Sequence, residues 1–199
     1  MLFELDDATR GVYLHHRSAL GEFFLSSDAV IPTFTREPRM RGIIDQIPRA
    51  DLDEFLRLGY TIGGMMIFPG NRIGRRMTIN GARGCHPRIK DRFDLTVECI
   101  RRHYLDEPSP LSETLARYAD FFALFADFRG YVDFFLLQDI VGRDYSAVSC
   151  WSPFTDFTDS PLPGGSVDAY NAYRLRAIEF IQARNHRIDR YLGASIQTR

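Results

Sequence analysis

The fold is organised around MTINGARGCHPRIKDRFDLTVECIRRHY, residues 77–104. Its apolar residues recur at spacings of four, four, three and four: Ile89, Phe93, Val97, Ile100 and Tyr104. At about 100° per residue, such spacing places side chains along one stripe of a helix. We therefore predict a helix from about residue 88, with Phe93, Val97 and Ile100 buried and Asp94 on another face.

Acidic residues follow a second pattern on this predicted helix. Asp91, Asp94 and Glu98 stand at i, i+3 and i+7, so we expect them to share a face. They are the candidate catalytic residues, either as ligands of a divalent metal or as a general base. Arg101 and Arg102 lie one turn further on and are candidates for substrate binding. The alternative is a solvated face whose charges pair with one another.

Glycines precede the predicted helix and point to an anion site. Asn80, Gly81, Arg83 and Gly84 suggest a turn that feeds a helix N-terminus, where free N–H groups bind phosphate. Arg83 adds a planar, charged fork, so Asn80 and Arg83 are the further candidates for substrate binding. Without ligand we expect Arg83 to pair with at least one acid and to keep it ionised. The alternative is an ordinary strand-to-helix turn.

Composition excludes several protein classes. The chain has 199 residues, 45% of them hydrophobic and 26% charged, and a net charge of −1. We expect one globular domain over 1–199. The charge provides no general attraction to nucleic acid or membrane, and no apolar run is long enough to span one. Cys85, Cys99 and Cys150 lack paired spacing and the chain begins without a signal-peptide pattern, so we predict free thiols and a cytoplasmic location.

The N-terminal part is predicted to be rich in strands. Aromatic and β-branched pieces separated by turn residues suggest short strands in 1–34. Residues 35–58 look helical, with breaks at Pro38 and Pro48 and with Asp51 as an N-cap. The residues 59–81 are predicted to form a β-hairpin.

The C-terminal part is predicted to be helical. Apolar residues at helical spacing occupy 111–125 and 128–141, and 142–166 is a long loop rich in proline and glycine. Ser166 is expected to cap a final helix from Val167 to Leu192. The predicted class is therefore α+β: a small, mostly antiparallel sheet in a strand-rich part, 1–84, packed on a helical part, 85–199.

Several long strings resemble an uncharacterised family of small bacterial proteins, a domain of unknown function. They are YTIGGMMIFPG, MTINGARG, DRFDLTVECIRRHY and FRGYVDFFLLQD. The resemblance covers most of residues 3–192 and implies a bacterial, cytoplasmic protein. It implies no activity, cofactor or catalytic residue.

The sequence supports two functional hypotheses. The first is an enzyme, a hydrolase or transferase, that acts on a phosphate-bearing nucleotide or nucleic acid, as a stress or defence effector in bacteria. The second is a non-catalytic binding or regulatory protein that docks a protein partner or a second copy of itself. The enzyme hypothesis requires a cavity in which Arg83 and the acids converge.

Overall fold

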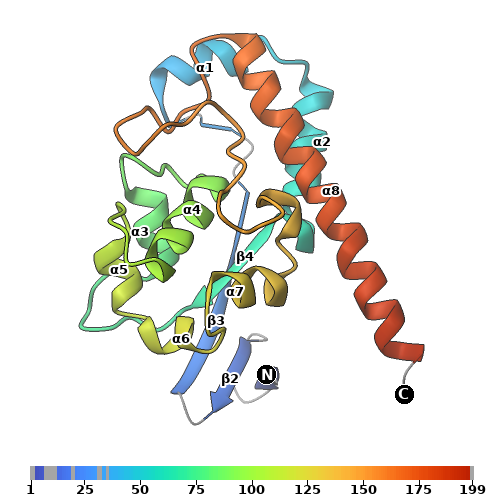
Figure 1. Cartoon of the computed structure of the whole chain (residues 1–199). Coiled ribbons are helices and arrows are strands. Elements are labelled where there is room, and N and C mark those ends of the chain that lie inside the picture. The colour runs from blue at the N-terminus through green and yellow to red at the C-terminus, as the bar shows by residue number, and fades with distance from the viewer. Residues whose placement is uncertain (1–2, 7–12, 19–20, 31–32, 35, 198–199) are drawn as a thin grey trace.

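The computed structural model describes residues 3–6, 13–18, 21–30, 33–34 and 36–197. Within these ranges the fold begins with an antiparallel sheet of four strands. The strands are β1 (Phe3–Asp6), β2 (Tyr13–Ser18), β3 (Gly21–Ala29) and β4 (Met65–Pro69), and they lie in that order. Helices dominate the chain after β3 (Figure 1). The class is therefore α+β, as predicted.

The pairing of β3 with β4 separates two faces of the sheet. Asp28 pairs with Met66 and Ser27 with Ile67. Because successive side chains on a strand alternate between faces, Ser27 and Ile67 share one face and Asp28 and Met66 share the other. A buried arginine lies on each face, Arg83 on the side of Asp28 and Arg184 on the side of Ser27, and each is close to its own cavity.

Two proline-started helices follow β3. Helix α1 (Pro38–Ile44) has its proline in the first turn, and Pro48 is the N-cap of α2 (Arg49–Gly59), so both predicted breaks are confirmed. The prediction of Asp51 as the N-cap is wrong. Asp51 lies in the first turn of α2, where its carboxylate accepts a hydrogen bond from Arg174 at 2.9 Å.

The predicted hairpin over 59–81 is wrong. A 3₁₀ turn, η1 (Ile62–Gly64), leads into β4, whose partner is the earlier strand β3. The expected return strand is instead the start of α3 (Ile79–Cys85), and Thr78 is its N-cap, accepting from the Gly81 N–H at 3.2 Å. Threonine is common both in strands and at helix N-caps, and in this structure Thr78 is an N-cap.

Helix α4 (Phe93–Tyr104) begins later than predicted. Lys90 and Asp91 have φ angles of 49° and 64°, so a left-handed turn separates α3 from α4 and leaves Asp91 outside the helix. Phe93, Val97 and Ile100 are buried, as predicted. The opposite side of the helix is buried too, which makes α4 the central helix of the core.

The later helices surround α4. They are α5 (Ser112–Ala116), α6 (Ala119–Ala123), α7 (Phe128–Phe135), the 3₁₀ turn η2 (Gln138–Ile140) and α8 (Val167–Gln197). The predicted helix over 128–141 ends early, because Leu136 adopts a left-handed backbone with φ of 54°. Ser166 accepts from the Ala169 N–H at 3.1 Å, so the predicted cap is confirmed.

Helix α8 runs past one whole side of the molecule, and its C-terminal end extends beyond the other elements (Figure 1). It packs on α2 and on η1. Although α8 spans 31 residues, no helix in the described ranges combines the length and the apolar character needed to cross a membrane.

Candidate functional site

Arg83 lies on α3 and is fully buried. Its Nη1 donates to Asp28 Oδ2 at 2.7 Å, and its Nε donates to Thr96 Oγ1 at 3.0 Å. Its Nη2 donates to the backbone oxygen of Asp91 at 2.8 Å. The guanidinium therefore joins β3, α4 and the turn before α4, and the expected pairing with an acid is present.

Asp91 is the second acid beside Arg83. Its Oδ1 lies 2.5 Å from Arg83 Nη1, without hydrogen-bond geometry, and no donor to this buried oxygen is found among the described residues. Asp28 and Asp91 therefore share one guanidinium nitrogen. Lys90 and Asp91 both hold left-handed backbone, a strain that residues other than glycine adopt at a cost of about 1–2 kcal/mol each. Such strain is often found at functional sites.

The pKa of Asp91 is raised above its ordinary value. Burial is the largest cause, because a buried carboxylate loses the stabilisation that water gives its charge. The Arg83 cation opposes the rise, and the neighbouring Asp28 carboxylate adds to it. Arg83 therefore lowers the pKa of Asp91 without returning it to the ordinary value, since the cost of burial exceeds the attraction of the cation.

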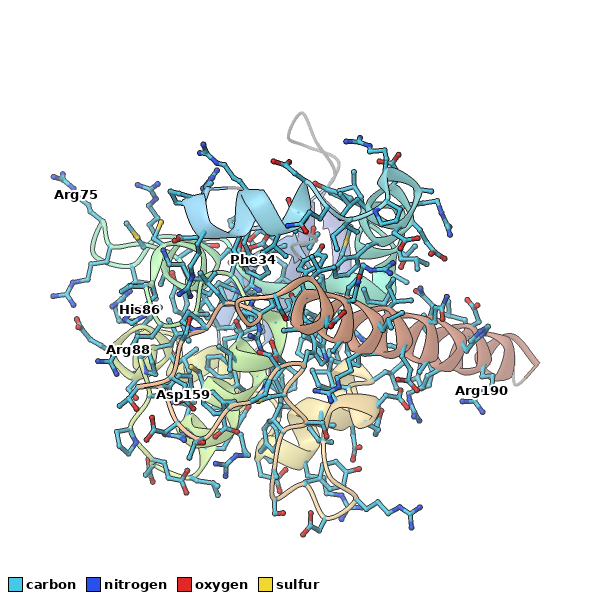
Figure 2. The ribbon with its side chains drawn as sticks, turned by 90° about the horizontal axis from the view of Figure 1, so that it is seen from above. Phe34, Arg75, His86, Arg88, Asp159 and Arg190 are labelled. Carbon is cyan, nitrogen blue, oxygen red and sulfur yellow. The ribbon has the colours of Figure 1, made fainter. Side chains whose placement is uncertain are left out.

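A cavity of about 490 Å³ lies beside this carboxyl group. Its lining is Thr33, Phe34, Arg36, Glu37, Gly84, Cys85, Lys90 and Asp91. Phe34, labelled in Figure 2, lies next to helix α1, and Arg36 is exposed. Lys90 pairs with Glu37 at 2.5 Å, and 31% of its side chain is exposed. The cavity thus combines one protonatable acid with two accessible cations, and we call it the Asp91 cavity.

Asp94 lies elsewhere and is fully buried. Both of its oxygens contact the Arg92 guanidinium, and Oδ2 accepts from the Trp151 N–H at 2.8 Å. Arg92 also donates to Ser152 Oγ and to the Pro161 oxygen, each at 2.7 Å. These contacts fasten the 142–166 loop over α4, so the chemistry of Asp94 is that of a structural ion pair.

Glu98 is held by the two arginines that follow it. Arg101 donates to both of its oxygens at 2.8 and 2.9 Å, and Arg102 donates at 2.8 Å. Asn80 Nδ2 donates to Ser26 Oγ at 3.0 Å on β3, near Arg83 but outside the lining of the Asp91 cavity. The structure therefore brings Arg83 to Asp91, and does not bring it to Asp94 or Glu98.

Metal ligands and thiols are the remaining groups with reactive chemistry. No group of three or more His, Cys, Asp or Glu side chains within the described ranges is arranged to hold a metal ion. All three cysteines are free thiols, as predicted. Burial raises the pKa of Cys99 and of Cys150 to about 12, while Cys85 is exposed beside the Asp91 cavity.

Asp28 and Arg36 are site residues that the sequence did not single out. Asp28 lies 55 positions before Arg83, and nothing in its strand pattern marks it. Arg36 stands in an irregular stretch before α1. Only the pairing of β3 with β4 and the packing of α3 on that face bring them beside Asp91, so no local signal was available.

Comparisons with known proteins are limited to the family level. No curated protein and no solved structure matches the chain. A family model does match, over residues 1–188, and its description is a family of unknown function. Since the match covers most of the 199 residues, the resemblance of the long strings to an uncharacterised family is confirmed, and this chain belongs to the family of unknown function DUF6994.

Proposed function

We propose that the protein is an enzyme that acts on a phosphate-bearing substrate, a nucleotide or a nucleic acid, bound in the Asp91 cavity. One observation carries this proposal. A carboxyl group with a raised pKa, held by a buried arginine, lines a cavity of about 490 Å³ together with Arg36 and Lys90. Carboxyl groups of this kind are suited to proton transfer, because their pKa lies closer to neutral pH.

Each residue of the cavity takes a distinct role in this proposal. Arg36 and Lys90 contact the phosphate, because they are the cations of the lining that remain accessible. Asp91 accepts or donates the proton of the reacting group. Arg83 binds no substrate, since its nitrogens are engaged inside the protein, and acts with Asp28 as a positioning residue for Asp91.

A divalent cation is part of the proposal through the two carboxylates at Arg83. Mg²⁺ typically binds one or two protein carboxylates together with substrate phosphates and water. Asp91 lines the cavity and Asp28 shares Arg83 with it, so these two carboxylates would hold the cation, and a bound nucleotide would provide the remaining ligands. Binding is therefore expected to strengthen when Mg²⁺ and nucleotide are added together.

The binding step is tested by calorimetric titration of the full chain with ATP, GMP and a short RNA, with and without Mg²⁺. We expect Arg36→Gln and Lys90→Gln each to weaken binding by about tenfold, which is about 1.4 kcal/mol. Arg190→Gln is the matched control, because this arginine lies far along α8 from the cavity (Figure 2). If no nucleotide or RNA binds, or if the cavity variants bind like the control, the proposal is wrong.

The catalytic step is tested with Asp91→Asn, which keeps the shape of the side chain and removes its proton chemistry. We expect unchanged binding in the absence of Mg²⁺, a weaker effect of Mg²⁺ on binding, and a loss of turnover of at least about a hundredfold. Alkylation of Cys85 gives an independent readout, since a ligand in the cavity would slow the reaction of this exposed thiol. Binding that persists while Asp91→Asn turns over normally would remove Asp91 from the mechanism.

A cytoplasmic location and a role in bacterial stress or defence belong to the same proposal. The three free thiols support the location, because thiols persist in a reducing compartment. Toxicity on expression that depends on Asp91 would support the role as an effector.

The second candidate function, a binding or regulatory protein, is favoured by the end of α8. This end extends beyond the other elements, and Tyr191 and Leu192 on it are 62% and 54% exposed (Figure 1). An exposed apolar surface of this kind suits contact with a second copy of the chain. Sedimentation equilibrium of the wild type and of Leu192→Asp would show whether self-association depends on it.

A further inference from the structure

Arg184 is a buried arginine on helix α8. Four arginines are buried in the described part of the chain, and the carboxylate partners of the other three are Asp28 and Asp91 for Arg83, Asp94 for Arg92, and Asp51 for Arg174. No ion pair within the described ranges includes Arg184, although only 5% of it is exposed. A buried charge is normally paired, because burial removes the stabilisation given by water.

Backbone oxygens hold the guanidinium in place. Arg184 Nε donates to the Phe135 oxygen at 3.1 Å, and Nη1 donates to the oxygens of Gly63 and Met65 at 3.0 and 2.7 Å. Its Nη2 makes no hydrogen bond within the described ranges, so two N–H donors are available. Burial lowers the pKa of Arg184 to about 10, and the group therefore stays charged at neutral pH.

This cation lines an apolar cavity of about 370 Å³, which we call the Arg184 cavity. Most of its walls are apolar: Leu25, Met65, Ile67, Phe134, Phe135 and Ile188. The strand residues among them lie on the face of the sheet opposite to Asp28. The volume is within the range of small-molecule sites, and apolar walls with one polar group are typical of them.

We propose that the Arg184 cavity binds a small amphipathic carboxylate, whose head group accepts hydrogen bonds from Arg184 Nη2 and whose apolar body contacts the cavity walls. A guanidinium charge with one nitrogen free to donate matches the single charge of one carboxylate. A phosphate dianion is a poor fit, because the described residues of the lining include a single cation, Arg184. The Arg184 cavity shares no lining residue with the Asp91 cavity, so this proposal can be tested independently of the proposed enzyme activity.

The probe is octanoate, titrated into the full chain by calorimetry, with 1-octanol and inorganic phosphate as comparisons. We expect octanoate to bind at one site, 1-octanol to bind at least about tenfold more weakly, and phosphate to give no heat from this site. Ser27→Phe places a large side chain on the cavity wall and leaves the contacts of Arg184 intact. It should weaken both octanoate and 1-octanol.

Arg184→Gln separates the charge from the cavity shape. In this variant octanoate should bind no better than 1-octanol, while the affinity for 1-octanol stays unchanged. Arg187→Gln is the matched control, since Arg187 lies one turn further along α8 and pairs with Asp139, and it should bind octanoate like the wild type.

Four results would overturn the proposal. Three of them are the absence of octanoate binding to the wild type, equal affinities for octanoate and 1-octanol, and octanoate binding that Ser27→Phe leaves unchanged. The last of these does not depend on Arg184→Gln folding, so the proposal can be tested with either variant. Octanoate binding that Arg184→Gln keeps at the wild-type level also contradicts it.

Discussion

The two faces of the sheet place buried arginines in opposite electrostatic settings. On one face Arg83 has two carboxylates, Asp28 and Asp91, on a single nitrogen. Behind the other face the hydrogen bonds of Arg184 within the described ranges go to backbone oxygens, and its guanidinium lies 6.0 Å from the centroid of the Phe93 ring. Burial raises the pKa of Asp91 although Arg83 lies beside it, and Arg184 keeps its positive charge with no ion pair in the described ranges. The comparison shows that burial alone does not define the role of an arginine, because the partner decides whether its charge is used inside the protein.

The largest effect is expected from Arg83→Met, because the change leaves two acids without their cation. Breaking a buried pair by removing one member typically costs about 3–5 kcal/mol. We expect a value near the lower end, since 33% of the Asp28 side chain is exposed. Urea unfolding at neutral pH measures the loss, and a variant within about 1 kcal/mol of the wild type would contradict the role of Arg83.

The triple variant Arg83→Met, Asp28→Asn, Asp91→Asn provides the control for this result. It removes the charges of both acids along with the arginine, so no buried charge is left unpaired. We expect it to recover at least about half of the stability lost in the single variant. A triple variant that is less stable than the single one would mean that packing, and not charge, accounts for the loss.

A smaller effect is expected from Arg184→Met. This change leaves neutral carbonyl groups without a donor, which costs about 1–3 kcal/mol, and it also removes a desolvated charge. The free energy of unfolding should therefore fall less than for Arg83→Met, although both side chains are buried. Arg187→Met, which removes a partly exposed pair with Asp139, should change stability by at most about 1 kcal/mol. Equal losses of unfolding free energy in Arg83→Met and Arg184→Met would contradict the proposed difference between the two arginines.

Local signals in the sequence predicted much of the fold. Two confirmed predictions depend on residues within one or two helical turns of each other. They are the buried stripe of Phe93, Val97 and Ile100 and the N-cap at Ser166. Pro38 and Pro48 start helices for the same local reason, because proline fixes its own backbone angle. Patterns of this range are readable without knowing the tertiary structure.

The candidate site was only partly predictable. Arg83 and Asp91 were singled out, but the left-handed turn at Lys90 and Asp91 has no glycine to mark it. The apolar period continues through Ile89, so the pattern suggested an uninterrupted helix. Asp28 reaches Arg83 only through the register of β3 with β4, and the partner of β4 was itself wrongly predicted. Contacts set by tertiary packing leave no trace in the spacing of nearby residues.

The smallest effect is a pH dependence that comes from Asp91. Its pKa is higher in the folded protein than the ordinary value of 3.8, mainly because the carboxyl group is buried. The folded state therefore binds this proton more tightly than the unfolded state does. The resulting stabilisation is fully present below the unfolded pKa, and it is lost as the pH rises through the folded pKa.

Asp91→Asn removes this contribution and suits the left-handed backbone, which asparagine tolerates. Urea unfolding of the wild type and of this variant, between about pH 3.5 and about pH 7, should show the wild type losing stability relative to the variant as the pH rises. Asp144 provides a control of opposite sign, because hydrogen bonds from Ser146 hold its pKa below the ordinary value. Against Asp144→Asn the wild type should gain stability as the pH rises. A flat or reversed difference for Asp91→Asn would mean that the attraction of Arg83 cancels the effect of burial on the pKa of Asp91, and the electrostatic contrast between Asp91 and an ordinary paired carboxylate would disappear.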